Sequence, residues 1–290
     1  MPEGPEVRRS ADVLNQILAG RRLSSLYAVG GRYKDNPPEG MVELLTFMQD
    51  RLTRLGADGH VLIKSVSCKG KFMYWTLRPD WTVWCTYGMS GQWSTQRDDK
   101  HCSIELCHRP DRTGILGGEG YLFFNDHRHF GTMKFVNDPD GSKTQKKLDS
   151  LGPDMLSDPP DDTTFRDCLL KHKDQTLAEV LMNQGVISGV GNYIKAEALY
   201  LSELSPHRTV TSLTIGECNR LRQQITNVMK ASYNNSGATF RTYRNPDGAE
   251  GGMQRRFVVY GNQTDPLGNP VVKEETKDGR TTHWVPAIQH

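Results

Sequence analysis

Hydrophobic positions at the start of the chain recur with a helical period. Four apolar residues follow one another at spacings of four, three and four, which places them on one face of a helix: Val7, Ala11, Leu14 and Leu18. Proline is favoured in the first turn of a helix and glycine just beyond its last turn, which are the positions of Pro2 and Gly20. The pattern predicts an amphipathic helix over residues 2–19.

From residue 21 to residue 135 the apolar and polar residues alternate as they do in β-strands. Short runs of apolar and polar residues are separated by glycine, proline, aspartate and asparagine: residues 61–66, 71–77, 82–86 and 121–124. Such runs, bounded by turn-forming residues, are typical of strands with one buried face. We therefore expect an all-β sandwich or barrel of antiparallel strands after the first helix.

Helical spacing returns in the second half of the chain. Residues 137–150 are polar and turn-rich and are expected to form a linker. Three runs with helical spacing follow it: residues 177–181, 194–201 and 215–233. Near the end, a turn over Asp265–Pro270 is flanked by the apolar stretches Phe257–Tyr260 and Val271–Lys273, which favours a terminal hairpin.

These patterns together predict a multidomain α+β protein. The expected parts are a β-sandwich domain with an N-terminal helix, a linker, a helical domain and a terminal hairpin region: residues 1–136, 137–150, 151–240 and 241–290.

Composition narrows the class of protein. No apolar run approaches the roughly 20 residues that a bilayer crossing needs, and no secretory h-region stands in the first thirty residues, so we expect an intracellular protein without membrane contact. The formal charge of +2 excludes a strongly basic tail, so any contact with nucleic acid must depend on where charges are placed. Six cysteines without a CxxC pair are expected to be reduced thiols.

The first two residues after Met1 could carry chemistry. Removal of Met1 would leave Pro2 with a secondary α-amine, whose pKa lies near 7.7–8.0 in ordinary α-amino groups against about 10.4 for lysine. Such an amine is available as a nucleophile toward an aldehyde-level carbon, where it forms an iminium, and Glu3 could donate or accept a proton beside it. The same residues are also what an ordinary helix start contains.

A glycine turn precedes the predicted helix over Tyr193–Leu201. Asn192 could cap this helix, and the free N–H groups of its first turn could bind a phosphate, with Lys195 adding positive charge. An ordinary turn between two helices would have the same glycines.

Three further segments combine glycine with polar or aromatic side chains. Met89 stands between glycines in residues 87–91, and Arg128 and Phe130 stand in residues 126–131. Such side chains are equipped to wedge into a base stack, or they could be partly buried residues of hairpin loops. Lys71 follows Gly70 and could hold a phosphate or be a strand-edge lysine.

Six motifs occur together and in order along the whole chain. They are MPEGPEV at residues 1–7, GK at 70–71, YGMSG at 87–91, DHRHFG at 126–131, LGPD at 151–154 and SGVGNYIKAEALY at 188–200. In this combination the chain resembles the formamidopyrimidine-DNA glycosylase/endonuclease VIII (Fpg/Nei) family. The resemblance implies a β-sandwich followed by a helix-two-turns-helix domain and a finger hairpin.

The resemblance also implies roles for single residues. Pro2 would be the nucleophile, Glu3 the proton donor that opens the deoxyribose ring, and Lys71 a catalytic lysine that grips a phosphate. Contacts to the DNA backbone would come from Asn192, Lys195 and Arg280. The void left by a flipped nucleotide would be filled by Met89, Arg128 and Phe130. Supporting acids would be Glu6 and Glu197.

The implied activity is that of a bifunctional DNA glycosylase and abasic-site lyase of base excision repair. Oxidised pyrimidines and ring-opened purines are expected as substrates ahead of 8-oxoguanine, with β,δ-elimination after an iminium intermediate and without a cofactor. The partner would be double-stranded DNA with an oxidised base or abasic site, with single-stranded or bubble DNA left open. We expect a monomer, in the nucleus of a eukaryote and in the cytoplasm or nucleoid otherwise.

The C-terminal end departs from the four-cysteine zinc finger that is common in the family. No cysteine follows Cys218, and Val285 and Ile288 occupy the places of the last cysteine pair, which resembles the zincless-finger members. Arg280 would keep the finger's contact with DNA. Residues 241–252 correspond to the loop that covers 8-oxoguanine in some members, and their glycines suggest mobility.

Two other classes of protein fit the sequence less well. A lesion-binding protein without turnover would keep the helical and finger modules but is expected to have a degenerate N-terminus, which this chain does not have. A zinc-dependent enzyme is not expected, because the sequence shows no cluster of metal ligands.

Overall fold

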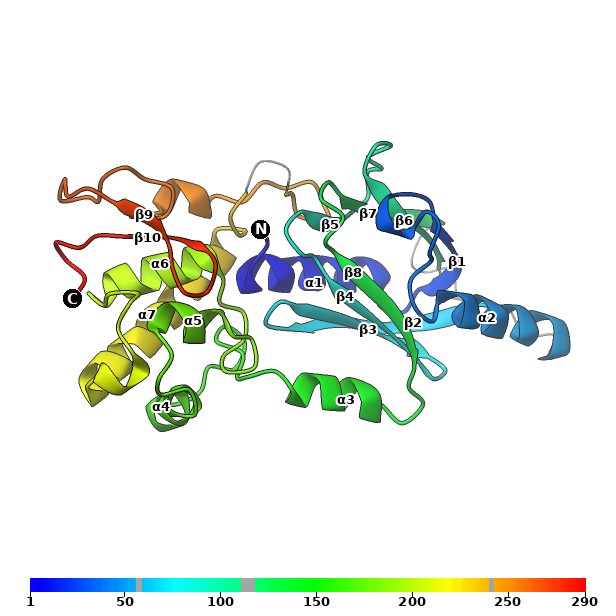
Figure 1. Cartoon of the computed structure of the whole chain (residues 1–290). Coiled ribbons are helices and arrows are strands. Elements are labelled where there is room, and N and C mark those ends of the chain that lie inside the picture. The colour runs from blue at the N-terminus through cyan, green and yellow to red at the C-terminus, as the bar shows by residue number, and fades with distance from the viewer. Residues whose placement is uncertain (56–58, 111–117, 240–242) are drawn as a thin grey trace. The chain divides into compact units, whose positions relative to one another are not determined.

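The computed structural model describes residues 1–55, 59–110, 118–239 and 243–290 (Figure 1). The chain divides into two compact units. The first consists of Met1–Pro2, Glu6–Leu148 and Thr239–Gly251, and the second of Glu3–Pro5, Asp149–Ala238 and Gly252–His290. The first unit thus extends beyond the predicted boundary at residue 136, and part of the predicted terminal region groups with it.

The first unit contains an eight-stranded sheet in the order β5-β7-β6-β1-β2-β3-β4-β8. Its strands are β1 (Arg22–Ala28), β2 (Val61–Lys69), β3 (Phe72–Arg78), β4 (Trp81–Thr86), β5 (Gly91–Ser94), β6 (Cys102–Arg109), β7 (Gly120–Asp126) and β8 (Thr132–Asn137). All neighbouring strands are antiparallel, which confirms the prediction.

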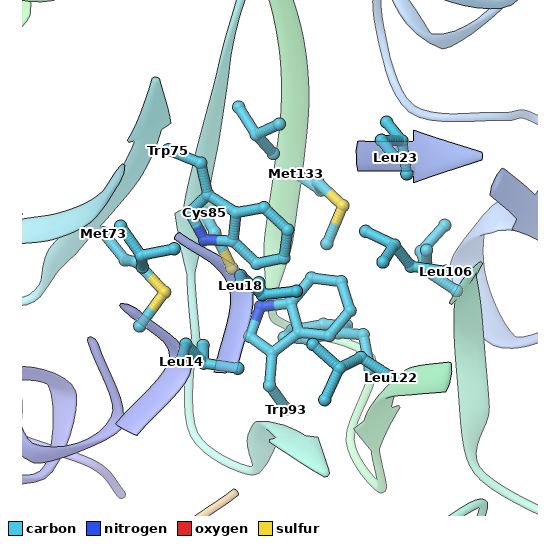
Figure 2. Close-up of a cluster of buried hydrophobic side chains, with 14 of the residues drawn as sticks. Leu14, Leu18, Leu23, Met73, Trp75, Cys85, Trp93, Leu106, Leu122 and Met133 are labelled. Carbon is cyan, nitrogen blue, oxygen red and sulfur yellow. The ribbon is translucent and has the colours of Figure 1, made fainter. Parts of the chain in front are cut away.

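The sheet bends so that its two halves face each other. Trp75 in β3 and Trp93 in β5 are separated by four strands in the sheet order, yet their ring centroids are 5.0 Å apart. Figure 2 shows both rings in one apolar cluster. The sandwich arrangement therefore comes from one continuous sheet folded over a shared core.

Helix α1 (Gly4–Leu18) supplies side chains to this core. Its predicted apolar face is buried, and Leu14 and Leu18 have no exposed area. Both lie among the aromatic and sulfur-containing side chains drawn in Figure 2. Since full burial of a leucine stabilises a fold by about 1.5–3 kcal/mol, this face fixes α1 to the sheet. The helix predicted over residues 2–19 is confirmed, with a start two residues later.

Two helices lie in segments that were expected to be strand or linker. Helix α2 (Met41–Leu55) interrupts the region expected to be all β, and it buries Met41, Leu44 and Met48 on one face. Helix α3 (Ser142–Asp149) lies within the expected linker. The sequence of α3 has no apolar face, so its periodicity did not predict a helix. Polar contacts hold it instead: the Asp138 carboxylate accepts hydrogen bonds from the backbone N–H groups of Lys143 and Thr144, both at 2.9 Å.

The second unit is helical and ends in a hairpin. Its elements are α4 (Asp162–Leu170), α5 (Leu177–Met182), α6 (Asn192–Leu201), α7 (Ile215–Asn234), β9 (Val272–Glu275) and β10 (Thr281–Trp284). Short 3-10 helices are η1 (Gly31–Tyr33) in the first unit and η2 (Val210–Ser212) and η3 (Met253–Arg256) in the second. The three predicted helical runs are confirmed as α5, α6 and α7, whereas α4 was not predicted.

The terminal hairpin is confirmed, but with different strands. Strand β9 pairs with β10 in antiparallel register, and the two lie side by side in Figure 1. Phe257–Tyr260 was expected to flank the turn as a strand and does not form one. Val285 is fully buried against Ala196 and Val259, so an apolar cluster lies at the end of the hairpin.

All six cysteines are free thiols, as expected. Among the described residues, no helix combines the length and the apolar character required to cross a membrane.

The buried His108 predicts a pH dependence of stability. Its Nδ1 accepts a hydrogen bond from Arg21 Nε at 2.6 Å and therefore has to be unprotonated. Burial, and next the charge of Arg21, lower the pKa of His108 from 6.5 to about 4. The unfolded chain thus binds the proton more readily, and stability is lost as the pH falls from 6.5 toward 4. At about 1.4 kcal/mol per pKa unit, the loss is about 3 kcal/mol.

Urea unfolding followed between pH 7.5 and pH 4.5 measures this effect. His108→Gln should flatten the pH dependence of the first unit's stability, while His172→Gln, in the second unit, is the control. An identical pH slope for His108→Gln and the unmodified protein would contradict the assignment.

Candidate active site

The carboxylate of Glu3 caps helix α6. Its Oε1 accepts a hydrogen bond from the backbone N–H of Tyr193 at 2.9 Å, and its Oε2 accepts one from Ile194 at 3.3 Å. Glu3 is only 2% exposed. The negative charge lies at the positive end of the helix dipole and satisfies N–H groups that the helix itself leaves unpaired.

This contact corrects two expectations. The N-terminal N–H groups of α6 were expected to bind a phosphate, but Glu3 already occupies those of residues 193 and 194. Asn192 was expected to cap the helix, whereas the N-cap is Gly191 and Asn192 is the first helical residue. A carboxylate distant in sequence replaces the local cap.

Glycines allow Glu3 to come this close. A Cβ atom on Gly191 would lie 2.2 Å from the Glu3 Cδ, so a side chain there would displace the Glu3 carboxylate from its position at the helix. The N–H of Gly4 also donates to the Gly189 carbonyl at 2.8 Å, and a Cβ on Gly4 would lie 2.9 Å from the Gly189 Cα. Residues 3 and 4 are therefore anchored along residues 189–194, and Pro2 directly precedes this anchored pair.

Asn192 and Arg280, both predicted DNA contacts, lie at the same part of the second unit. The Asn192 side-chain amide donates to the carbonyl of Thr281 at 2.8 Å, next to Arg280 in the chain. Arg280 is exposed in the turn between β9 and β10, which is closed by a hydrogen bond from the N–H of Thr276 to its carbonyl at 3.1 Å. The structure thus brings these two residues together.

Lys195 supports this turn from inside. Its side chain has no exposed area, and its Nζ lies 2.6 Å from Asp278 Oδ2. The other Asp278 oxygen accepts a hydrogen bond from the Thr276 hydroxyl. Burial lowers the pKa of Lys195, and Asp278 opposes that shift. Lys195 was expected to contact the DNA backbone, but the structure places its side chain in the interior and its ammonium group against Asp278.

Glu197, one of the two predicted supporting acids, holds the chain before the hairpin. Its carboxylate accepts hydrogen bonds from three consecutive backbone N–H groups at 2.9, 3.0 and 2.7 Å: Val258, Val259 and Tyr260. Burial raises the pKa of Glu197, and these hydrogen bonds oppose the shift. These contacts give residues 258–260 hydrogen-bond partners outside a strand.

Glu6, the other predicted acid, lies in the first unit. It is fully buried, and its backbone carbonyl accepts a hydrogen bond from the Tyr243 hydroxyl at 3.0 Å. Burial, and next the charge of Glu6, raise the pKa of Tyr243. Tyr243 is thereby tied to the first helix.

Lys71 occupies a two-residue turn between β2 and β3. The strands close on the pair Lys69 and Phe72, and Gly70 takes the first turn position with φ of 56°. Glycine adopts this left-handed conformation at little cost, which presents Lys71 at the tip of the hairpin.

The predicted void-filling residues lie on two loops that pack together. The Ser90 hydroxyl donates to Asp126 Oδ1 at 2.6 Å and accepts from the N–H of Arg128 at 2.8 Å. A Cβ on Gly88, where φ is +55°, would lie 2.6 Å from the Phe130 carbonyl carbon. This close approach joins the Met89 loop to the loop of Arg128 and Phe130.

The ends of these loops are accessible. Phe130 is 54% exposed, and the Arg128 guanidinium carbon lies 5.3 Å from its ring centroid. An exposed aromatic ring under a cation is suited to contact with bases and phosphates.

The loop predicted over residues 241–252 is described from residue 243 onward, so its start at Arg241 lies outside the described residues. The N–H of Arg244 donates to Gln92 Oε1 at 2.6 Å, and the N–H of Thr95 donates to the Pro246 carbonyl at 3.3 Å. The described part is thus anchored to β5 and the residue that follows it.

Sequence reasoning missed one cluster of metal-binding side chains. Asp98, His101 and His127 place three potential ligand atoms within 4.8 Å of one another, so the expectation that no such cluster exists is wrong. Asp98 and His101 are close in sequence, but His127 joins them only because β6 and β7 pair at Cys102 and Asn125. The available signal was aspartate and histidine in residues 98–101 together with a histidine shortly after the strand predicted over residues 121–124.

Comparisons with known proteins agree in all parts of the chain. Residues 1–133 match the family model of the formamidopyrimidine-DNA glycosylase N-terminal domain, residues 151–244 its H2TH domain and residues 253–290 its C-terminal domain. The formamidopyrimidine-DNA glycosylase of Thermus thermophilus is 31% identical over 297 residues, covering 100% of this chain and 98% of the relative.

Solved structures have the same fold. The crystal structure of the MutM (Fpg) protein from Thermus thermophilus has a TM-score of 0.81 at 29% identity, covering 99% of this chain and 98% of that one. Lactococcus lactis Fpg, solved with DNA that contains an abasic site, has a TM-score of 0.78 at 22% identity over 99% of both chains.

The ion pair of Lys195 and Asp278 can be tested by unfolding. Lys195→Met leaves the Asp278 carboxylate, only 4% exposed, without its cation. We expect a loss of about 3–5 kcal/mol in the free energy of unfolding of the second unit, measured in urea, and partial recovery in the double variant with Asp278→Asn. Lys230→Met, on an exposed position of α7, is the control. Equal losses in the two lysine variants would refute the role of the pair.

Proposed function

Since the chain belongs to the formamidopyrimidine-DNA glycosylase family, we propose that it removes oxidised bases from DNA and then cleaves the strand at the abasic site. The observation that carries this proposal is the anchored start of the chain, where Glu3 is held by the first turn of α6 and Pro2 directly precedes it. The residue with the reactive amine thus directly precedes an acid that is held in place.

Pro2 is the proposed nucleophile. Once Met1 is removed, its secondary amine has an intrinsically lower pKa than a lysine, so a larger fraction is unprotonated near pH 7. The nitrogen forms a bond to C1′ of the deoxyribose and gives up its own proton, and the damaged base leaves with the electrons of the glycosidic bond and takes up a proton in its place. Glu3 supplies the proton that opens the sugar ring, which leaves a cationic iminium between Pro2 and C1′.

Strand cleavage follows from the charge on the iminium. The cation acidifies the C2′ proton, and loss of this proton expels the 3′ phosphate by β-elimination. Loss of the 5′ phosphate by δ-elimination completes the reaction, and water releases Pro2. None of these steps oxidises or reduces the sugar, and each needs only the transfer of protons. The proposed reaction therefore has no cofactor.

Contacts to DNA come from residues of both units. A base cannot be reached inside a duplex, so the damaged nucleotide is extruded and its place is filled by Met89, Arg128 and Phe130. Lys71 and Asn192 are proposed to contact phosphates near the lesion. Arg280 spans a backbone phosphate with its planar guanidinium.

The proposed substrates are oxidised pyrimidines and ring-opened purines in double-stranded DNA, together with abasic sites. The formamidopyrimidine in the relatives' name is itself a ring-opened purine, which supports that part of the proposal. We propose that the protein acts as a monomer wherever the cell keeps its DNA, in a nucleus or in a cytoplasm with a nucleoid.

Borohydride trapping tests the nucleophile. Incubation with duplex DNA that carries an abasic site, in the presence of borohydride, should give a covalent adduct of one chain per duplex. Peptide mass mapping should locate the adduct on an N-terminal peptide that begins at Pro2. Pro2→Gly should slow adduct formation, and Pro286→Gly, at an exposed proline, should not.

Three results would count against this mechanism: a retained Met1, an adduct on a lysine, or an unchanged trapping rate in Pro2→Gly. Tight binding of abasic DNA without adduct or nicking would instead favour the lesion-binding protein without turnover.

Arg280 provides a separate test of DNA binding. Arg280→Ala should weaken affinity for different lesions alike and lower the slope of log affinity against log salt by about 1, since one phosphate contact is lost. The single-turnover rate of bound substrate should stay unchanged. Lys277→Ala, at an exposed position of the same turn, shows whether any cation has this effect. If affinity and salt slope are unaffected in Arg280→Ala, the finger assignment is wrong.

A further inference from the structure

Asp98, His101 and His127 form a group in the first unit that no step of the proposed reaction uses. Asp98 Oδ2 lies 3.0 Å from His101 Nδ1 and 3.3 Å from His127 Nε2. The centroids of the two imidazole rings lie 3.8 Å apart, and the ring planes meet at an angle of 31°. Both rings therefore present a nitrogen to the same carboxylate oxygen.

These separations fit a tetrahedral metal ion. Zinc bonds of about 2.0–2.1 Å to nitrogen and oxygen at tetrahedral angles put neighbouring ligand atoms about 3.3 Å apart. The separations of 3.0 and 3.3 Å from Asp98 Oδ2 to the two histidine nitrogens are close to this value, and all three ligand atoms lie within 4.8 Å of one another. Two imidazoles on one tetrahedral ion have ring centroids about 5 Å apart, so the two rings, now 3.8 Å apart, rotate away from each other when the ion binds.

The backbone holds the carboxylate in place. Asp98 Oδ1 accepts hydrogen bonds from the N–H groups of Lys100 and His101, both at 3.1 Å. The N–H of Asp98 donates to Asn125 Oδ1 at 3.2 Å, and the N–H of Cys102 donates to the Asp98 carbonyl at 2.7 Å. Because Oδ1 is engaged in this turn, Oδ2 is directed to the two histidines.

The chemistry of the donor set selects the ion. Two imidazoles and one carboxylate suit zinc and its neighbours in the transition series, whereas magnesium and calcium prefer oxygen ligands. The side chains are 21%, 32% and 28% exposed for His101, Asp98 and His127, which leaves an ion a path from solvent and a fourth position for water.

We infer that Asp98, His101 and His127 bind one zinc ion, which joins the segment between β5 and β6 to the turn that follows β7. His127 directly precedes Arg128, so the ion would restrain the loop that carries Arg128 and Phe130. Only this last consequence for DNA rests on the proposed function, since the ion site stands on the geometry of the first unit.

Metal titration of the full chain tests the site. After treatment with a chelator and dialysis, addition of Co²⁺ should give the visible absorption of four-coordinate cobalt at one equivalent, and Zn²⁺ should displace it. Zn²⁺ should raise the Tm, whereas Mg²⁺ should not. Asp98→Asn and His127→Gln should each weaken zinc binding by about 100-fold or more.

His207→Gln is the matched control, because His207 also pairs with a carboxylate, Glu274, at 2.7 Å but without a second histidine. This variant should leave the stoichiometry and affinity unchanged. Uptake that persists at full affinity in both Asp98→Asn and His127→Gln, or that is lost in His207→Gln, would overturn the inference.

Chemical modification of the unaltered protein gives a second measurement that does not depend on the folding of variants. Diethyl pyrocarbonate modifies accessible histidines, and zinc should protect His101 and His127 while leaving His207 reactive. Absence of this protection, or absence of stoichiometric metal uptake, would overturn the site. None of these readouts contains DNA, so a failure of the proposed glycosylase activity would not alter them.

Discussion

The structure of the second unit depends on one carboxylate at the start of one helix. Glu3 accepts hydrogen bonds from Tyr193 and Ile194, N–H groups that α6 cannot satisfy by itself. A buried N–H without a partner costs about 1–3 kcal/mol, so this contact links the beginning of the chain to a helix far along it. The absence of a side chain at Gly191 is the condition for the contact.

Helix α6 then organises the hairpin through two buried charges. Lys195 pairs with Asp278 in the turn, and Glu197 holds the backbone of residues 258–260. Together with the buried Val285, these contacts shape the end of the chain by ion pairing, hydrogen bonding and apolar packing. A buried charge without its partner costs free energy, so each of these contacts favours the one geometry in which the charge is paired or hydrogen-bonded.

In the first unit, too, one carboxylate organises several segments. One continuous sheet bends around a core that contains α1, and Asp126 at the end of β7 accepts hydrogen bonds from Ser90, Arg128 and Gly131. That single carboxylate joins two loops whose outer residues are Met89, Arg128 and Phe130. His127 lies on the same turn and faces Asp98, so this turn contributes both to the loops held by Asp126 and to the cluster of Asp98, His101 and His127.

The sequence by itself determined the elements whose pattern is local: the first helix, the extended runs and α5 to α7. It did not predict α3, which is held by Asp138 and not by an apolar face, and it assigned Lys195 to a contact with DNA, whereas this side chain is buried and paired with Asp278. Only the tertiary structure decided that Glu3 caps α6 and that His127 meets Asp98. The physical reason is range: periodicity and turn chemistry depend on neighbours in the chain, whereas a buried charge finds its partner only after strands and helices have packed.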